Sequence, residues 1–314
     1  MFLIKYINKS SSCQPMAKTI IVGSIGLDDF KTPFRDLKAI LGGSAVYASH
    51  AASFFTNVGI VSIAGEDFPE EHKNLLTSRN INIEGIEFKG KTFRWSGEYE
   101  YDMNEAKTLN TELNSIIEFS AELPNNYKDA EYILLGNIDP ELQLKVIEQL
   151  NQPKLIAMDT MNFWIESKKT QIIEVIKKID LLLLNDGEAR QLFDTVSLVD
   201  AGSKALALGP KYVIIKKGEH GALLFTNSSH FNAPGYPLEV FKDPTGCGDS
   251  FAGGLLGWLA KTDNLSEPNL RKAIVYGSTI ASFNAENFSL ERQKTLTMEE
   301  INARYNEFEK MREF

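Results

Sequence analysis

Short runs of Val, Ile and Leu recur along the chain and alternate with longer amphipathic segments. The runs are almost entirely apolar, with Ser62 as an exception, and they occupy residues 20–22, 59–63, 132–135, 155–158, 181–184 and 212–215. Helical spacing of apolar residues occupies 45–55, 70–79, 140–150, 169–179 and 187–193. Strands that are apolar throughout are typical of a parallel sheet with helices on both faces. The pattern therefore predicts an α/β fold built on a doubly wound, mainly parallel sheet flanked by helices.

Two segments interrupt this alternation. Residues 29–41 follow the first predicted strand without a helical period, and residues 83–110 carry the alternating and aromatic positions of antiparallel strands. We expect the two segments to pair into a small β-sheet lid over the carboxyl ends of the parallel strands, where open α/β sheets bind ligands. A structural hairpin or a contact between two subunits is the alternative interpretation.

The N-terminal residues 1–17 read as a flexible extension, and residues 18–314 read as the folded domain. The first buried strand begins at Thr19, and the preceding apolar stretch is short, contains Lys5 and lacks a small-residue cleavage site. No apolar run reaches the roughly 18 residues that cross a bilayer. We therefore expect a cytoplasmic protein that does not bind membranes.

Composition limits the classes of ligand. Hydrophobic residues make up 43% of the 314 residues, which is enough for a large core. Lys and Arg total 33 against 42 Asp and Glu, giving a formal charge of -9, so nucleic acid is not an expected partner. Two cysteines and four histidines show no metal-ligand spacing. An anionic ligand must therefore be held locally, by backbone amides, a few basic side chains or a metal ion.

The segment DPTGCGDSFAGG at residues 243–254 carries the most chemical information. Its glycines precede an apolar helical run, so that amide groups and the helix N-terminus converge on one anion-binding position. A carboxylate at Asp249 would repel a simple phosphate guest. The carboxylate makes chemical sense if it takes a proton from a hydroxyl group that attacks a bound phosphorus. A helix N-cap after a glycine turn is the alternative.

This segment resembles the signature D-T/P-T-G-A-G-D of the ribokinase-like (PfkB) carbohydrate kinase family, with Cys247 where Ala is usual. The stretch LGGSAVYA at residues 41–48 resembles the glycine-pair signature of the same family, about 200 residues earlier in the chain. The resemblance extends from about residue 18 over nearly the whole chain. It implies a ribokinase-like fold, ATP and Mg²⁺ as cofactors, and transfer of the γ-phosphoryl group to a hydroxyl group.

The resemblance assigns catalytic roles to the turn itself. It makes Asp249 the base and the amides of Gly246, Cys247 and Gly248 the anion hole for the phosphoryl group. It places Asp243 and Thr245 where family members often bind a monovalent cation, so K⁺ is an expected additional cofactor. We also expect the Cys247 thiol to have a lowered pKa, because it lies at a helix N-terminus.

Two further motifs indicate where the nucleotide binds. Residues 185–188 (NDGE) resemble the family motif N-x-x-E, in which Asn185 and Glu188 support Mg²⁺ largely through water. Residues 216–221 (KKGEHG) resemble the turn K-x-G-x-x-G at the ATP site. Without the resemblance, the first motif would predict only a helix N-cap and the second only a β-turn. The predicted nucleotide-binding residues are Asn185, Glu188, Lys217, Gly218, Gly221, Thr245 and Asn287.

The residues expected to bind the acceptor differ most from those of ribokinase. That enzyme carries G-G-K-G-A-N where this chain has GGSAVY at residues 42–47, and Trp164 stands where Arg is common. The pocket is therefore expected to be more aromatic, for a sugar, a nucleoside or a related polyol. The resemblance and position along the chain assign to the acceptor Asp28, Gly42, Gly43, Ser44, Tyr47, Arg94, Asn137 and Asp159. A strand-end turn is the alternative role for Asp28.

The sequence thus predicts a kinase that acts on a hydroxyl group, with a primary hydroxyl as the expected acceptor. Two alternatives stay open at this point. One is a non-catalytic sugar or nucleoside sensor that keeps the fold and the pocket. The other is a kinase of an already phosphorylated sugar, which would need basic side chains such as Arg94 and Lys91 in the pocket. A homodimer through the lid is also expected.

Overall fold

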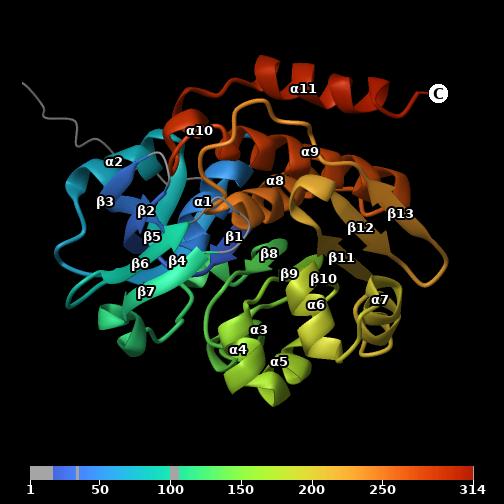
Figure 1. Ribbon diagram of the computed structural model, residues 1–314. Helices are drawn as coiled ribbons and strands as arrows, with labels where there is room; N and C mark the ends of the chain where they lie inside the picture. Colours follow the sequence, from blue (N-terminus) through green and yellow to red (C-terminus); the bar gives the residue numbers. More distant parts are fainter. Residues whose placement is uncertain (1–16, 33–34, 100–105, 314) are drawn as a thin grey trace, which may run out of the picture.

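A computed structural model describes residues 17–32, 35–99 and 106–313 (Figure 1). The predicted N-terminal extension, apart from Ala17, lies outside the described residues. Within those ranges the strands form two sheets, a large one and a small one. No helix in the described ranges combines the length and apolar character that crossing a membrane requires.

The large sheet has the strand order β13-β12-β11-β10-β9-β8-β1-β4-β5 in the described part of the chain. The strands from β5 to β11 run parallel, and β12 and β13 add antiparallel at one edge. The bounds are β1 Thr19–Val22, β4 Val58–Ala64, β5 Ile81–Phe88, β8 Tyr132–Leu135, β9 Leu155–Met158, β10 Leu181–Asn185, β11 Tyr212–Lys216, β12 Ala222–Phe225 and β13 His230–Ala233. The predicted doubly wound, mainly parallel sheet is confirmed.

Helices cover both faces of this sheet because its central strands are apolar on both sides. In β1, Ile21 belongs to one buried cluster and Ile20 and Val22 belong to the other. One face is covered by α1 Ser44–Ala52, α2 Glu70–Ser78, α8 Cys247–Thr262 and α9 Glu267–Ala285. The other face is covered by α3 Pro140–Gln149, α4 Asn162–Ser167, α5 Lys169–Ile176, α6 Asp186–Phe193 and α7 Leu198–Leu206. The short helix α10 (Glu291–Thr295) and helix α11 (Met298–Lys310) follow α9.

The small sheet is the lid, with strand order β3-β2-β6-β7 among the described residues. Its strands are β2 Gly26–Lys31, β3 Asp36–Gly42, β6 Phe93–Tyr99 and β7 Ala106–Glu112. The predicted lid segments 29–41 and 83–110 do pair, but residues 83–88 belong to β5 of the large sheet. The prediction placed them in the lid because β5 is an edge strand, whose partly exposed side chains alternate like those of an antiparallel strand.

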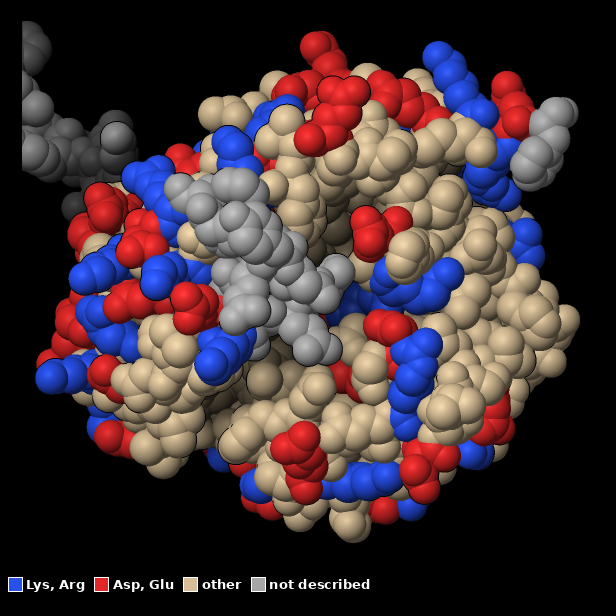
Figure 2. Space-filling view, in the orientation of Figure 1, with Lys and Arg blue, Asp and Glu red and all other residues tan. Residues whose placement is uncertain are grey.

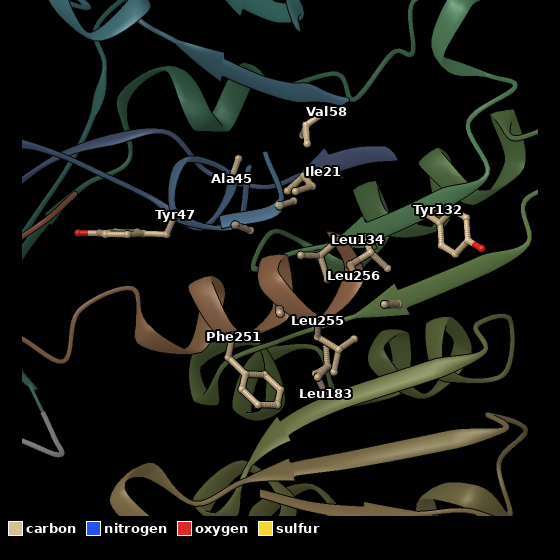
Figure 3. Close-up of a cluster of buried hydrophobic side chains, with 14 of the residues drawn as sticks. Ile21, Ala45, Tyr47, Val58, Tyr132, Leu134, Leu183, Phe251, Leu255 and Leu256 are labelled. Atoms are coloured by element: carbon tan, nitrogen blue, oxygen red, sulfur yellow. The ribbon is translucent and has the colours of Figure 1, made fainter. Parts of the chain in front are cut away.

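The two glycine-rich signatures meet through the packing of α1 against α8. A Cβ atom on Gly253 would overlap the carbonyl oxygen of Ala48, and one on Gly257 would lie 2.9 Å from the Cα atom of Ala52. The helices therefore touch backbone to backbone. Figure 3 shows Ala45 and Tyr47 of α1 beside Phe251, Leu255 and Leu256 of α8. This contact brings the start of α1, just after the glycine pair, next to the start of α8.

Candidate active site

Three neighbouring parallel strands deliver polar side chains to one edge of the large sheet. Asp159 follows β9, Asn185 ends β10 and Lys216 ends β11. Because carboxyl ends of parallel strands lie along the same edge, these residues come together although the chain separates them widely. The Lys216 ammonium forms an ion pair with the Asp159 carboxylate, with only 15% and 7% of the two side chains exposed. In Figure 2, acidic and basic side chains border a hollow near the centre of the visible face.

The turn at residues 243–250 lies beside this edge and opens α8. Gly246 has φ 74°, a left-handed conformation that favours glycine. Its carbonyl accepts from the Ser250 amide at 2.8 Å, and the Cys247 amide donates to the Pro244 carbonyl at 3.1 Å. Of the three predicted anion-hole amides, that of Cys247 is therefore bonded within the turn. Among the described residues, the amides of Gly246 and Gly248 have no such acceptor.

Tyr47 forms the floor of this turn. A Cβ atom on Gly246 would overlap the Tyr47 ring, so only glycine lets the turn lie this close to α1. The Tyr47 side chain is 1% exposed. Tyr47 is predicted to line the acceptor pocket, and the structure places its ring against the turn at residues 243–250, where it supports Gly246.

Asp249 lies in the first turn of α8 with its carboxylate in the same polar cluster. Burial raises the pKa of Asp249 to about 6, the nearby Asp159 carboxylate adds to the rise, and Lys216 opposes it. Burial alone would lower the pKa of Lys216, but the carboxylates of Asp159 and Glu188 outweigh it and raise that pKa. The lysine is therefore charged at neutral pH, and Asp249 is a stronger base than an exposed aspartate.

Asn185 and Glu188 form a reciprocal capping box at the start of α6. The Asn185 side-chain oxygen accepts from the Glu188 amide at 2.7 Å, and Glu188 Oε2 accepts from the Asn185 amide at 2.7 Å. Residues 185–188 therefore do form a helix N-cap, which is the structure expected of this motif without the family resemblance. Burial raises the pKa of Glu188 to about 8, and the Asp159 carboxylate adds to this effect. Glu188 is thus also a buried carboxylate that faces the cluster.

The described residues contain no group of three or more His, Cys, Asp or Glu side chains placed to hold a metal ion by themselves. Mg²⁺ commonly binds through one or two carboxylates, several waters and the phosphates of its substrate. The buried Glu188 carboxylate with the Asn185 side chain beside it suits that mode, because a cation would stabilise its ionised form. The donor set therefore fits Mg²⁺ that arrives with a nucleotide.

The two lysines of the K-x-G-x-x-G turn point to different places. Lys217 Nζ donates to Asn232 Oδ1 at 3.3 Å in an exposed position, whereas Lys216 points into the cluster. Sequence reasoning selected Lys217 and missed Lys216 as a site residue. The signal was available, because successive residues at a strand end face opposite sides and only one of the two lysines could face the cleft. Gly218 and Gly221 bound the tight turn that follows.

At the predicted site for a monovalent cation, the Asp243 carboxylate accepts hydrogen bonds from backbone amides. Asp243 is fully buried, and its two carboxylate oxygens accept from the amides of Thr245 at 2.9 Å and Ser289 at 3.1 Å. Burial raises the pKa of Asp243, and the hydrogen bonds from Thr245 and Ser289 oppose that rise. Asn287 lies after α9, where its side-chain oxygen accepts from the Phe288 amide at 3.0 Å. A K⁺ site at Asp243 and Thr245 and a nucleotide contact at Asn287 stay predictions.

The expectation of a reactive Cys247 is wrong. Burial raises the pKa of the Cys247 thiol to about 12. Its Sγ atom lies 3.5 Å from the Ala281 carbonyl oxygen and 3.6 Å from Asn284 Nδ2, so it packs against α9. The helix N-terminus would lower the pKa of an accessible thiol, but here removal from water dominates. The sequence does not reveal that α9 covers this position.

Asp28, predicted to bind the acceptor, lies in β2 with its carboxyl group buried. Burial raises the pKa of its carboxyl to about 7, and the carboxylates of Asp243, Asp29 and Asp249 add to the rise. The carboxylate lies against Gly42, where a Cβ atom would overlap it. Gly43 and Ser44 follow at the start of α1, and the Ser44 hydroxyl accepts from the Ser24 amide at 3.0 Å. The glycine pair therefore leaves room for the Asp28 carboxylate, and Ser44 fastens the adjoining loop.

Strand pairing in the lid decides which aromatic and basic side chains accompany Asp28. In the parallel pair of β2 and β6, Asp28 is opposite Trp95 and Leu27 is opposite Arg94. Partners in such a pair share a face, so Trp95 lies on the same face of the lid as Asp28 and Arg94 lies on the other. Arg94 interacts electrostatically with Asp67 instead. The structure therefore does not bring the predicted Arg94 together with the acceptor residues.

Asn137 and Asp159 lie near each other at the ends of β8 and β9. Asn137 Oδ1 accepts from the Trp164 indole at 2.9 Å, and its amide contacts the Met161 sulfur. Trp164 thus replaces the expected arginine with a side chain that holds Asn137. Asp159 combines its ion pair to Lys216 with a hydrogen bond from the Thr160 amide at 3.0 Å.

The sequence of this chain matches a known protein family. The family model described as pfkB family carbohydrate kinase matches residues 31–294. The cytidine kinase of Thermococcus kodakarensis is 28% identical over 261 residues, which cover 80% of this chain and 92% of that protein. The chain therefore shares most of its length with a curated kinase.

Solved structures agree on the fold. The nucleoside kinase of Methanocaldococcus jannaschii superimposes with a TM-score of 0.75 at 21% identity, covering 92% of this chain and 98% of that one. An E. coli protein described as a candidate ribokinase II and crystallised with ATP and Mg²⁺ superimposes with a TM-score of 0.76 at 18% identity, covering 93% and 99%. With the family match over most of its length, the chain belongs to the PfkB family of carbohydrate kinases and is a kinase with the ribokinase-like fold.

Proposed function

We propose that this protein is an ATP-dependent kinase that phosphorylates a hydroxyl group of a nucleoside, the primary hydroxyl being the expected acceptor. The observation that carries the proposal is Asp249, a half-buried carboxylate next to Gly248, whose amide has no acceptor within the turn, at the start of α8. A base beside an anion hole suits the attack of an alcohol on a phosphoryl group.

The chemistry balances with the groups at hand. The acceptor oxygen forms a bond to the γ-phosphorus, the bond between that phosphorus and the β,γ-bridging oxygen breaks, and ADP leaves. The acceptor proton passes to the Asp249 carboxylate, whose pKa of about 6 keeps it ionised at neutral pH. The amides of Gly246 and Gly248 face the charge on the transferring group. Mg²⁺, held through Asn185 and Glu188 and water, would neutralise phosphate charge.

A nucleoside suits the acceptor side better than a small sugar does. Trp95 and Phe93 lie on the same lid face as Asp28, so a flat apolar group and a carboxylate are presented together. A base ring gains stacking and apolar burial on such side chains, and ribose hydroxyls donate hydrogen bonds to a carboxylate. The names of two relatives, cytidine kinase and nucleoside kinase, support the same substrate class.

The two alternatives fare less well. A sensor without catalysis would not require a base beside the anion hole, yet Asp249 is present with a perturbed pKa. A kinase of phosphorylated sugars would need cations around the acceptor. Arg94 lies on the opposite lid face, and Lys91 is exposed before β6.

A homodimer through the lid is part of the same proposal. The side chains of Leu109 in β7 and Leu113 just after it are 56% and 48% exposed, and β7 ends the strand order of the lid sheet. Exposed apolar side chains along a sheet edge favour association. Light scattering of wild type and of a variant with Lys at both positions should distinguish a dimer from a monomer.

The kinase proposal is tested by ADP release from ATP and Mg²⁺ across nucleosides, sugars and polyols. We expect the best acceptor to be a nucleoside, and we expect Asp249→Asn to reduce kcat by about 10²–10⁴-fold with that acceptor. The matched control is Asp200→Asn, an exposed first-turn aspartate of α7 that should retain activity. Equal turnover by wild type and Asp249→Asn would refute the assigned base.

A further inference from the structure

Helix α11 runs alongside α9 (Figure 1), and a cavity of about 210 Å³ lies between the two helices. The lining from α9 consists of Pro268, Arg271, Lys272 and Val275. The lining from α11 and the turn after it consists of Tyr305, Phe308, Glu309 and Arg312. Each set follows the spacing i, i+3, i+4 and i+7, so each occupies one face of its helix. We call the cavity between these faces the α9–α11 groove.

The α9–α11 groove is separate from the proposed active site. Val275 lies roughly ten residues, or about 15 Å of helix, before Ala285 at the end of α9. The Ala285 carbonyl accepts from the Asp243 amide at 3.4 Å, so it is this far end of α9 that meets the turn at residues 243–250. A molecule in the groove would therefore occupy a second site.

Three basic side chains and one acidic side chain line the groove. The guanidinium carbons of Arg271 and Arg312 lie 5.0 and 5.1 Å from the centre of the same Phe231 ring in β13. Arg271 pairs with Glu267 at 2.5 Å, whereas neither Lys272 nor Arg312 forms an ion pair in the part of the chain that the structure describes. Two cations of a chain with a formal charge of -9 are thus left without a counter-ion at one place.

Arg271 also keeps an unused hydrogen-bond donor. Its Nε atom is buried and has no hydrogen-bond partner among the described residues. The ion pair to Glu267 and the contact with the Phe231 ring hold the guanidinium in place. A buried donor without an acceptor costs free energy, and native structures usually satisfy such a group with a ligand or water. A donor of this kind beside two unpaired cations indicates an anion with several acceptor oxygens.

The rest of the lining is apolar or aromatic. Val275 and Phe308 are 5% and 1% exposed, so they form a fixed wall. The ring of Tyr305 stacks on that of Tyr276, with the centroids 4.3 Å apart and the planes 16° apart. Burial raises the pKa of Tyr305, which keeps its hydroxyl protonated and able to donate. The groove therefore offers an immobilised aromatic ring beside its positive charge.

We propose that the α9–α11 groove binds a small phosphate monoester that carries an aromatic or other flat apolar group. Arg271, Lys272 and Arg312 donate to the phosphate oxygens, and the flat group packs against Val275, Tyr305 and Phe308. Guanidinium groups suit the planar arrays of phosphate oxygens, and a monoester dianion supplies the charge that the two unpaired cations lack. The cavity is smaller than the roughly 300–1,000 Å³ of drug-sized sites, which favours a compact ligand.

Calorimetry with phenyl phosphate tests the site, in the presence of saturating ADP and Mg²⁺ so that the nucleotide site is filled. We expect wild type to bind phenyl phosphate at least about 10-fold more tightly than inorganic phosphate, because the phenyl ring is buried. Arg312→Gln and Lys272→Gln should each weaken binding of phenyl phosphate by about 10-fold, as loss of a charge-assisted hydrogen bond does. The matched control is Lys310→Gln, which removes an exposed charge of α11 that does not line the groove and should leave the affinity unchanged.

The competing explanation is that the groove is an imperfect contact between two helices with solvated charges at its edge. It predicts no measurable binding by wild type, or an equal loss in Lys310→Gln and Arg312→Gln, and either result would overturn the inference. Equal affinities for inorganic phosphate and phenyl phosphate would overturn the assigned ligand class. Unchanged ADP affinity in each variant shows that the variant is folded. The inference does not depend on the acceptor of the proposed kinase, so a failure to phosphorylate nucleosides leaves it standing.

Discussion

Gln293 in α10 joins a buried chain of polar side chains behind the phosphate-binding turn. Its amide nitrogen donates to Ser250 Oγ at 2.8 Å and to Asn284 Oδ1 at 2.7 Å. Its oxygen lies 3.2 Å from His50 Nδ1, and Asn284 donates to the Thr245 carbonyl at 2.8 Å. Replacing Gln293 by Leu should therefore destabilise the fold at the turn that the chemistry uses.

The magnitude follows from the partners that the change leaves unpaired. Gln293 is 0% exposed, and Leu has a similar volume, so packing changes little. Burial lowers the pKa of His50 to about 3, so His50 is neutral, and with Gln293 Oε1 as acceptor its Nδ1 carries the proton. The variant strands this N–H group and Asn284 Oδ1 in the interior. At about 1–3 kcal/mol for each of these two unpaired groups, the free energy of unfolding should fall by about 2–6 kcal/mol.

Urea unfolding followed by circular dichroism measures this change. The matched control is Gln191→Leu, because Gln191 makes an exposed hydrogen bond to Glu166 and its loss should cost less than about 0.5 kcal/mol. A cost below about 1 kcal/mol for Gln293→Leu would refute the reasoning, since it would mean that the stranded groups find other partners.

Two further predictions concern stability. Asp28→Asn should raise the unfolding temperature more at about pH 8 than at about pH 5, because a folded-state pKa raised from 3.8 to about 7 contributes stability that is fully present below 3.8 and is lost progressively as pH rises from 3.8 to about 7. Thermal unfolding at both pH values tests this, and an equal shift at both would contradict it. Gly253→Ala should cost roughly 1–3 kcal/mol or more, because the new methyl group overlaps the Ala48 carbonyl and separates α1 from α8. Urea unfolding measures the cost, and Gly90→Ala, whose added Cβ meets open space but whose φ of 67° disfavours alanine, reports the cost of backbone strain without a steric overlap.

The fold was predictable from the sequence because central strands that are buried on both faces consist of consecutive apolar residues. The runs at β1, β4 and β8 to β11 are apolar at successive positions, which partly exposed strands do not show. Strand order leaves no comparable mark, and β5 shows the limit. Its pattern is that of a strand with one open side, and only its pairing with β4 shows that it belongs to the large sheet.

The turn proposed for catalysis could be selected from the sequence because its residues are contiguous, whereas the residues proposed to bind the acceptor are brought together by strand register. Asp249 and the turn glycines lie within four residues of one another. The choice between Arg94 and Trp95 depends on which of them shares a face with Asp28, and the pairing of β2 with β6 sets this. A shift of one residue would exchange the two side chains. The Cys247 thiol illustrates the same point, because its pKa is set by α9, a helix distant in sequence.

Burial of the acidic cluster affects both the basicity of Asp249 and the kind of anion that the site can bind. Removal from water raises the pKa of Asp249 to about 6, which strengthens the proposed base while leaving it ionised at neutral pH. The same burial brings Asp159 close to Asp249, and these two carboxylates oppose a bare phosphate. In a chain with a formal charge of -9, only local positive charge can reverse that sign. In the proposed kinase, this positive charge comes from Lys216, from the amides of Gly246 and Gly248 and from a cation that arrives with the nucleotide. An acidic site of this kind therefore selects a nucleotide that carries its metal over a free phosphate anion, which the base would repel.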